Sequence, residues 1–471
     1  MAPQSSPLRN PHVAVFAFPY GTHAAPLLNL TIKLARAAPH VSFSFFTTDK
    51  SKHSLFSSSS SNHNNIPPNI LPYVVSDGIP DAHHFPSPHP LERVNLFLRA
   101  GPRNLKEALR QAVSRANERV TCVISDAFVT SALVVAQELG VPWVALWTSY
   151  SFSLSAHLNT DLIRQKYSCA NDDDDDGGNG SLGFVVPGFS KMRIQDLPDG
   201  IIQEEGGEET VFSRMLDSLG RVLPQAKAVI VNFYEELEPP SLIHHLRSKI
   251  PSLIYSGFLN LSLPILPSPP SSHTHDKTGS LSFLTKHAPN SVAYISLGTV
   301  VAPPPHELAA MAEALEQSKV PFLWSLREDL RAFLPKGFIE RTSNNGKGKI
   351  VNWAPQTLVL GHGCVGVFVT HGGCNSVSEG VSCGVPMICR PYFGDQFMAS
   401  RMLEAVWEVG VKIEVFTKEA LMKNLNVILV QKEGKVMREK ARALKNIVLD
   451  AAGPKGKVEK EYFKSLVQLV S

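Results

Sequence analysis

A short run of residues after an apolar stretch carries the backbone and side chains that a diphosphate would need. The strand-like stretch 365–370 ends in residues 371–376, His-Gly-Gly-Cys-Asn-Ser, and a helical pattern follows. Glycine lets backbone approach a ligand closely, and a helix start offers unpaired N–H groups at the positive end of its dipole. Ser376 and Glu379 also match a capping box, which needs no ligand. This segment alone leaves both interpretations open.

Two flanking segments could complete a nucleotide site. Residues 353–356, Trp-Ala-Pro-Gln, place an aromatic face and an amide at what should be another strand end. Downstream, Asp395 and Gln396 start a helix. Taken alone, Trp353 would more often be a half-buried core residue, and Asp395 an N-terminal cap. Their meaning depends on whether the three segments act together.

A histidine and an aspartate in the first half of the chain could form a base and its orienting partner. His23 lies just after the strand-like run 13–18, and Asp126 just after the run 120–125. One parallel sheet could present both side chains at the same edge. Histidine can take a proton near neutrality, and a carboxylate can hold its useful tautomer. A lone histidine at a helix start is more often a surface or capping residue.

The elements that must position these residues alternate along both halves of the chain. Apolar runs separated by helical patterns are typical of parallel sheets. A stretch rich in proline and serine, 262–279, interrupts the alternation and is the best linker candidate. The predicted strands lie at residues 13–18, 41–46, 120–125, 143–147, 292–297, 322–326, 365–370 and near 387.

The chain, at 471 residues, suits two domains rather than one. The predicted class is α/β, with two facing Rossmann-like domains, parallel sheets and a ligand cleft at the carboxyl ends of the strands. The expected parts are an amino-terminal domain 1–261, the linker 262–279, a carboxyl-terminal domain 280–455, and a final helix, 456–471, that returns to the first domain.

Composition argues against several other classes. The net charge is +3 with no basic stripe among aromatics, so no nucleic acid partner is expected. No run of roughly 18 apolar residues and no secretory pattern occur, so we expect a cytoplasmic protein without a membrane span. The six cysteines include no C-x-x-C pair and are predicted to be reduced thiols. Dinucleotide and P-loop motifs are absent, and the acidic run 172–176 is expected to be a solvated loop rather than a metal site.

Together these segments resemble the signature box of plant secondary-product UDP-glycosyltransferases. The resemblance covers essentially the whole chain, including residues 18–23 and 296–299, and is strongest to flavonoid and anthocyanidin 3-O-glucosyltransferases. It implies the GT-B fold, a monomer, and inverting transfer of glucose from UDP-glucose to a flavonol or anthocyanidin hydroxyl, without metal or other cofactor. The residues at the family's spacing are Trp353, Gln356, His371, Gly372, Asn375, Ser376, Glu379, Pro386, Asp395 and Gln396.

The resemblance also implies roles in donor binding. Trp353 would stack under the uracil, Ala354 would read its edge through the backbone, and Gln356 and Glu379 would lie at the ribose. Gln396 implies glucose, because an amide can both donate to and accept from neighbouring hydroxyls. Phosphates would be bound by Thr299, His371, Asn375 and Ser376, the sugar by Thr148, Asp395 and Gln396, and the site completed by Ser296, Gly372 and Cys374.

On the acceptor side, the resemblance implies that His23 takes the hydroxyl proton, that Asp126 orients it, and that His157 contacts the acceptor. Cys374 departs from the family, since many relatives carry tryptophan there. Its backbone N–H can still serve, so the departure bears on donor affinity and sugar preference.

Acceptor identity is the least defined inference. Leu91 and Pro198 occupy positions where some relatives place glutamine, so another small phenolic, a hormone or a terpenoid stays an alternative. A nucleotide-sugar sensor without catalysis would be expected to lose the base, yet His23 and Asp126 are both present. An epimerase would need a dinucleotide, and the missing glycine motif counts against it.

Overall fold

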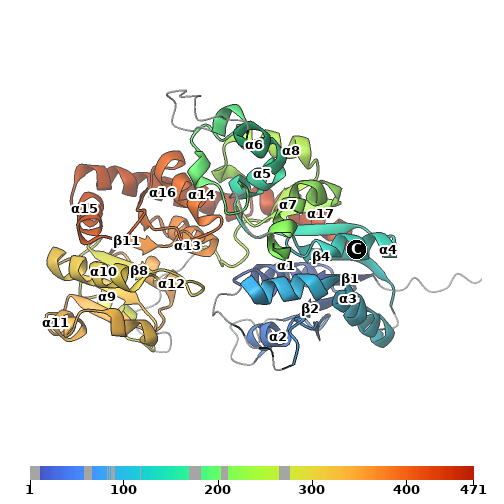
Figure 1. Cartoon of the computed structure of the whole chain (residues 1–471), viewed down its shortest axis with the longest axis horizontal. Helices are drawn as coiled ribbons and strands as arrows, with labels where there is room; N and C mark the ends of the chain where they lie inside the picture. Colours follow the sequence, from blue (N-terminus) through green and yellow to red (C-terminus); the bar gives the residue numbers. More distant parts are fainter. Residues whose placement is uncertain are drawn as a thin grey trace, which may run out of the picture.

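The computed structural model describes residues 11–57, 66–81, 83, 85, 91–116, 118–168, 182–202, 210–264 and 276–471. They form two α/β halves that lie side by side, the amino-terminal half on the right in Figure 1. The acidic run 172–176 and most of the predicted linker, residues 265–275, lie outside the described residues.

The amino-terminal half contains a seven-stranded parallel sheet in the order β3-β2-β1-β4-β5-β6-β7. Its strands are β1 (His12–Phe16), β2 (Ser42–Thr47), β3 (Ile70–Val74), β4 (Val120–Asp126), β5 (Trp143–Trp147), β6 (Ala228–Val231) and β7 (Leu253–Tyr255). The accompanying helices are α1 (Ala24–Ala37), α2 (Asp49–Phe56), α3 (Leu91–Ala116), α4 (Ser131–Leu139), α5 (Ser151–Leu158), α6 (Thr160–Ser168), α7 (Val211–Val222) and α8 (Pro240–Lys249).

The carboxyl-terminal half contains a six-stranded parallel sheet in the order β10-β9-β8-β11-β12-β13. Its strands are β8 (Val292–Ser296), β9 (Phe322–Ser325), β10 (Gly348–Val351), β11 (Val365–Thr370), β12 (Met387–Cys389) and β13 (Gly410–Lys412). Its helices are α9 (Ser280–Leu284), α10 (Pro305–Ser318), α11 (Phe338–Asn344), α12 (Gln356–Leu360), α13 (Cys374–Cys383), α14 (Gln396–Arg401), α15 (Lys418–Leu429) and α16 (Lys432–Ala452).

The strands are apolar on both sides because both faces of each sheet are buried. In β1, Ala14 and Phe16 contribute to one hydrophobic core, while Val13 and Val15 contribute to the core on the opposite face. Side chains alternate across a strand, so only a continuous apolar run can serve two cores at once. The α/β prediction with two parallel sheets is confirmed.

The strand orders place a switch point in each sheet. The direction in which successive strands are added to the sheet reverses between β1 and β4 in the first sheet and between β8 and β11 in the second, while all strands stay parallel. Crevices at the carboxyl ends of strands flanking such a point are the usual ligand sites in open α/β sheets. His23 follows β1 and Asp126 ends β4, while His371 follows β11. The topology therefore brings the predicted site residues to these two points.

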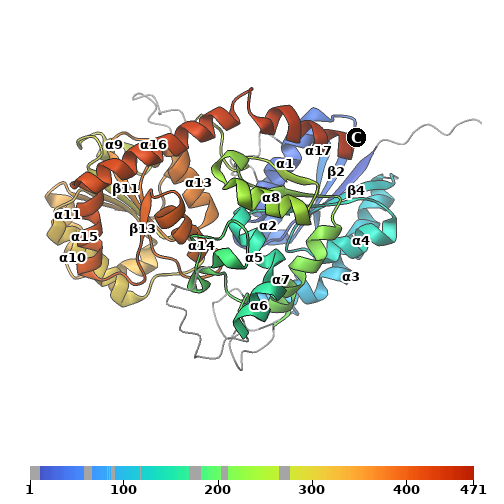
Figure 2. The ribbon, with the colours of Figure 1, turned by 90° about the horizontal axis from the view of Figure 1, so that it is seen from above.

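The two halves pack directly against each other. The rings of Phe233 and Trp407 stack with centroids 6.1 Å apart, and the Trp407 indole donates to the Leu237 carbonyl at 3.2 Å. Figure 2 shows α16 running across the top of the molecule, followed by η9 (Val458–Tyr462) and α17 (Phe463–Val470). Leu466 and Val470 of α17 belong to the core under α1. The predicted domain bounds stay a prediction.

Candidate functional site

Two cavities of about 740 and about 650 Å³ open between the halves and share part of their walls. The larger, called the acceptor cavity here, is lined mainly from the amino-terminal half, and the smaller, the donor cavity, mainly from the carboxyl-terminal half. His23, Thr148, Ser149 and Asp395 line both. A group bound at this junction would therefore contact both halves.

His23 and Asp126 form a partly buried pair at the junction. His23 Nδ1 lies 2.9 Å from Asp126 Oδ2 and 3.1 Å from the Thr148 hydroxyl. The Phe128 backbone N–H donates to the other carboxylate oxygen at 2.9 Å, which fixes the Asp126 side chain. His23 is the first residue before α1, but its side chain makes no capping bond to that helix. The alternative that His23 is a surface or capping residue is therefore wrong.

The pKa of His23 reflects two opposing effects. Burial lowers it, but the charge and hydrogen bond of Asp126, with the charge of Asp395, outweigh burial and raise the pKa above 6.5. The His23 side chain keeps 23% of its surface exposed, while Asp126 is fully buried. With Nδ1 occupied by Asp126, the other ring nitrogen, Nε2, is the one available to a ligand. This arrangement can accept a proton and hold it.

The acceptor cavity is walled by aromatic and aliphatic side chains. The Phe128 and His23 rings lie 4.9 Å apart, and Trp147 packs edge-on against His157 at 5.5 Å. His157 is buried, and burial lowers its pKa to about 4, so it is a neutral hydrogen-bonding group. Further lining residues are Phe18, Tyr20, Leu91, Val94, Pro198, Phe212, Leu216, Val300 and Phe393.

Trp353 lies in the donor cavity with 65% of its surface exposed. The interpretation of this residue as half-buried core is therefore wrong. Ala354 beside it is buried and also lines the cavity. A large, exposed aromatic face at a cavity wall suits a planar base.

Four polar side chains form a hydrogen-bond network in the wall of the donor cavity. The Tyr294 hydroxyl donates to Gln356 Oε1 at 3.0 Å, and Gln356 Nε2 donates to the Ser376 hydroxyl at 3.2 Å and to the Glu379 carboxylate. Burial raises the pKa of Glu379 to about 7, and the Gln356 bond opposes that shift. The network fixes Gln356 and Glu379, the two side chains predicted to meet a ribose. Both line the donor cavity.

Helix α13 begins without a capping side chain. Its N-cap residue is Gly373, no side-chain cap bond is present, and Glu379 bonds to Gln356 instead. The capping-box interpretation of Ser376 and Glu379 is therefore wrong, because the helix begins earlier than that box requires. Asn375 Oδ1 accepts from Asn260 Nδ2 of the amino-terminal half at 3.1 Å. The first turn thus keeps backbone N–H groups for an anion in the donor cavity.

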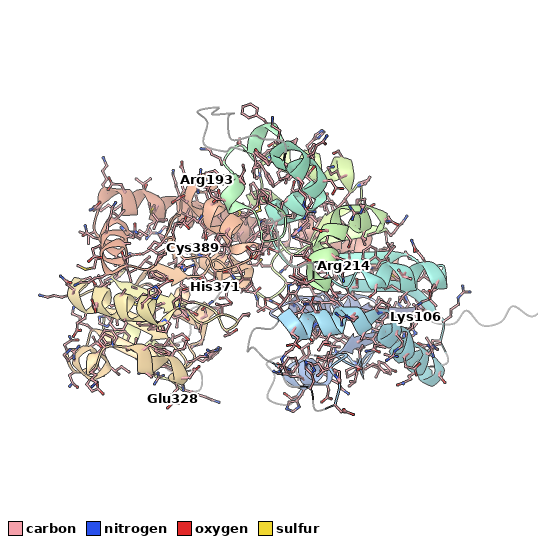
Figure 3. The ribbon with its side chains drawn as sticks, viewed as in Figure 1. Lys106, Arg193, Arg214, Glu328, His371 and Cys389 are labelled. Atoms are coloured by element: carbon pink, nitrogen blue, oxygen red, sulfur yellow. The ribbon has the colours of Figure 1, made fainter. Side chains whose placement is uncertain are left out.

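Glycines let the backbone close around His371. A Cβ on Gly298 would lie 2.7 Å from His371 Nε2, and one on Gly373 would lie 2.5 Å from it. Burial lowers the pKa of His371 to about 4, so the ring is neutral. Figure 3 labels His371 with Cys389, which ends the neighbouring strand β12.

Gly372 was predicted to bind the sugar donor, but it does not line the donor cavity, and this part of the prediction is corrected. Its φ is +83°, and a Cβ there would lie 2.7 Å from Cys389 Sγ. The Tyr150 hydroxyl donates to its carbonyl at 3.2 Å. Glycine is needed there to turn the chain behind the cavity wall. The other predicted donor residues line the cavity: Thr148, Ser296, Thr299, Trp353, Ala354, Gln356, His371, Cys374, Asn375, Ser376, Glu379, Asp395 and Gln396.

The loop before α14 presents Asp395 and Gln396. Asp395 occupies the N-cap position, but its side chain makes no cap bond and accepts from the Ser149 hydroxyl of the other half. The capping interpretation of Asp395 is therefore wrong. Gln396 Oε1 accepts from the backbone N–H groups of Tyr392 and Phe393 at 2.9 and 3.4 Å. Its carbonyl is thus engaged by the loop, and the NH₂ group is left to face a ligand.

Sequence reasoning missed Ser149, Tyr294 and Asn260 of this site. Ser149 and Asn260 follow β5 and β7, and the carboxyl ends of these strands are the signal that could have found them. No group of three or more His, Cys, Asp or Glu within the described ranges is placed to hold a metal ion. The same residues contain no helix that is long and apolar enough to cross a membrane.

Two parallel-sheet halves facing a shared cleft, with the His23–Asp126 pair at one wall and an uncapped helix at the other, fit the GT-B class of glycosyltransferases. A family model described as "UDP-glucoronosyl and UDP-glucosyl transferase" matches residues 99–450. The chain belongs to this family and is an enzyme that transfers a sugar from a UDP-sugar.

Relatives support this over the full length. The chain is 46% identical to an anthocyanidin 3-O-glucosyltransferase of Vitis vinifera over 98% of each chain. It is 45% identical to a flavonol 3-O-glucosyltransferase of Arabidopsis thaliana, over 100% of this chain and 99% of that one. A crystal structure of a UDP-glucose: anthocyanidin 3-O-glucosyltransferase in complex with UDP superimposes with a TM-score of 0.89 at 50% identity, covering 98% of this chain and 99% of the other.

Proposed function

We propose that the protein transfers glucose from UDP-glucose to the 3-hydroxyl of a flavonol or anthocyanidin, with inversion at the anomeric carbon. The observation that carries this proposal is the His23–Asp126 pair at the junction of the two cavities. A base at that point can reach an acceptor hydroxyl in one cavity while the anomeric carbon approaches from the other.

In the proposed step, the acceptor oxygen attacks the anomeric carbon on the face opposite UDP. The new C–O bond forms as the bond to the diphosphate breaks, and UDP leaves with the electron pair. The hydroxyl proton passes to His23 Nε2, and the Asp126 carboxylate stabilises the imidazolium through Nδ1. Single displacement from the opposite face inverts the configuration.

The donor cavity suits UDP in three separate places. Trp353 offers an exposed ring for uracil, and the carboxylate of Glu379 suits ribose hydroxyls. The first turn of α13, with Thr299 and the neutral His371, offers donors and a positive dipole to the diphosphate. Charge developing on the leaving group would be stabilised by these donors, so the proposed mechanism uses no metal.

The acceptor class is inferred from relatives and from the cavity. Relatives named as anthocyanidin and flavonol 3-O-glucosyltransferases match at 45–46% identity. The aromatic wall of Phe18, Phe128, Trp147 and Phe212 suits a planar polyphenol, and the neutral His157 offers it a hydrogen bond.

A product assay tests the proposal. The protein is incubated with UDP-glucose and a panel of flavonols, anthocyanidins, simple phenols and terpenoid alcohols, and products are identified by mass and by NMR. We expect a β-glucoside at the 3-hydroxyl of flavonols or anthocyanidins. Faster turnover of a simple phenol or terpenoid would overturn the acceptor class, and an α-linked product would overturn the mechanism.

A further inference from the structure

One hydrogen bond crosses the cleft at the point where the two cavities meet. The Ser149 hydroxyl, just after β5, donates to Asp395 Oδ2, at the start of α14. These residues are separated by 246 positions in the chain, and both line both cavities. The bond therefore joins the floor of the acceptor cavity to the loop that presents the predicted sugar-binding residues.

The neighbours of Ser149 tie this bond to the base. Thr148, the preceding residue, places its hydroxyl 3.1 Å from His23 Nδ1. Ser153, one turn into α5, places its hydroxyl 3.4 Å from that of Ser149 and donates to the Tyr150 carbonyl at 2.9 Å. Two consecutive side chains thus contact the base and the sugar loop.

Asp395 depends on partners because it is a partly buried acid. Burial raises its pKa, and the Ser149 hydrogen bond and the charge of His23 oppose that rise. A carboxylate accepts up to about four hydrogen bonds through its two oxygens. The bond from Ser149 to Oδ2 therefore leaves capacity for sugar hydroxyls while it fixes the side chain.

We propose that Ser149 is a positioning residue, which holds Asp395 across the cleft in the orientation that binds the donor sugar. This rests on the proposed function, in which Asp395 binds that sugar. The sugar subsite is then complete only when the two halves are together, since one half supplies the carboxylate and the other supplies the group that orients it. A side chain oriented before binding loses less freedom when the ligand arrives.

Equilibrium binding of UDP and UDP-glucose separates this role from a merely structural role of Ser149, which would affect both ligands equally. UDP lacks the sugar, so an effect through Asp395 must appear with UDP-glucose alone. Ser149→Ala should weaken UDP-glucose binding about three- to tenfold, the range that one net hydrogen bond covers, with UDP within about twofold. Ser149→Thr and Ser149→Val form a matched pair of equal shape. The threonine variant should bind UDP-glucose like the wild type, and the valine variant should bind like Ser149→Ala.

Two further variants make the outcome decisive. Trp407→Phe removes another hydrogen bond between the halves, the one to the Leu237 carbonyl, and should leave the UDP to UDP-glucose ratio unchanged. Asp395→Asn should weaken UDP-glucose selectively. Equal loss of both ligands in Ser149→Ala and Ser149→Val, or no loss of UDP-glucose, would overturn the role of Ser149. If Asp395→Asn also showed no selective loss, the assignment of Asp395 in the proposed function would fail instead.

Discussion

The donor and acceptor cavities differ in how their walls are built. The largest share of the donor wall comes from one segment, residues 353–396, with glycine turns, a helix start and fixed hydrogen bonds. The acceptor wall collects single side chains from segments as distant as Phe18 and Phe393. A site made from one segment is specified by local spacing, whereas a site made from scattered side chains is specified only by the fold.

The two cavities also divide the chemical work. The donor cavity holds groups that suit a charged diphosphate and a nucleobase. The acceptor cavity holds His23, the proposed proton acceptor, among apolar side chains. The comparison therefore predicts that variants of the His23–Asp126 pair change turnover with little effect on nucleotide binding. Variants of the donor cavity should weaken nucleotide binding.

The largest expected effect lies on the acceptor side. His23→Ala should lower kcat by about 10²–10⁴-fold, the usual contribution of a general base, while UDP binding changes little. The reason is that Trp353 and α13 lie in the other half. Turnover with a flavonol and the dissociation constant of UDP are measured on the same preparation. Near-wild-type turnover in a folded variant, with an acceptor hydroxyl that is not already acidic, would remove His23 as the base.

Asp126→Asn should lose much of the same activity and should also move the pH profile. The base is active when neutral, so kcat/KM falls as pH drops through the pKa of His23, which Asp126 raises. Removing that charge lowers the pKa, and the acid limb should move to lower pH. The double variant should cost far less than the product of the single effects, since the pair acts as one unit. An unmoved acid limb would contradict the assignment.

On the donor side, Trp353→Ala should weaken both UDP and UDP-glucose by roughly 5- to 150-fold, because base stacking is typically worth about 1–3 kcal/mol. The thermal midpoint should stay near that of the wild type, since 65% of the side chain is exposed. Binding is measured by calorimetry and stability by thermal melting. A folded variant with unchanged UDP affinity would show that the base binds elsewhere.

The same contrast decides what the sequence could predict. Long apolar runs located strands well, and β5 (Trp143–Trp147) and β11 (Val365–Thr370) match their predicted ends. Five strands were missed, because runs this short carry little periodicity: β3 (Ile70–Val74), β6 (Ala228–Val231), β7 (Leu253–Tyr255), β10 (Gly348–Val351) and β13 (Gly410–Lys412). The UDP-glycosyltransferase family was predicted from the box at 353–396, and the family match confirms it.

The contact between Ser149 and Asp395, which belong to different halves, was beyond prediction, whereas the alternation of strands did predict that His23 and Asp126 lie at one sheet edge. The bond from Ser149 to Asp395 exists only because β5 and the loop after β12 reach the same cleft. Local spacing was also misleading once, since Ser376 and Glu379 match a capping box that the helix does not use. Tertiary placement of Gln356 gives that glutamate its partner.

The smallest expected effect concerns the choice of sugar. The structure changes the physical reason for expecting it. The sequence predicted that the Gln396 amide both donates to and accepts from sugar hydroxyls, but Oε1 is held by the backbone N–H groups of Tyr392 and Phe393. Selection must then use the two N–H donors of the NH₂ group. A neutral imidazole offers one donor, so Gln396→His should lower the preference for UDP-glucose over UDP-galactose by about three- to tenfold, the value of one net hydrogen bond.

Overall similarity cannot replace this measurement. An anthocyanidin 3-O-galactosyltransferase of Rhododendron delavayi is 44% identical to the chain, nearly as similar as the glucosyltransferases. We expect wild-type kcat/KM to be higher with UDP-glucose, and the affinity for UDP to be the same in Gln396→His, because UDP lacks the group that Gln396 selects. Binding of UDP is therefore the control that separates a lost sugar contact from a damaged loop. A wild-type preference for UDP-galactose would show that the side chain at 396 does not set the choice of sugar. The difference between glucose and galactose would then have to arise elsewhere in the donor cavity, where Cys374 lies with Ser149 and Asp395.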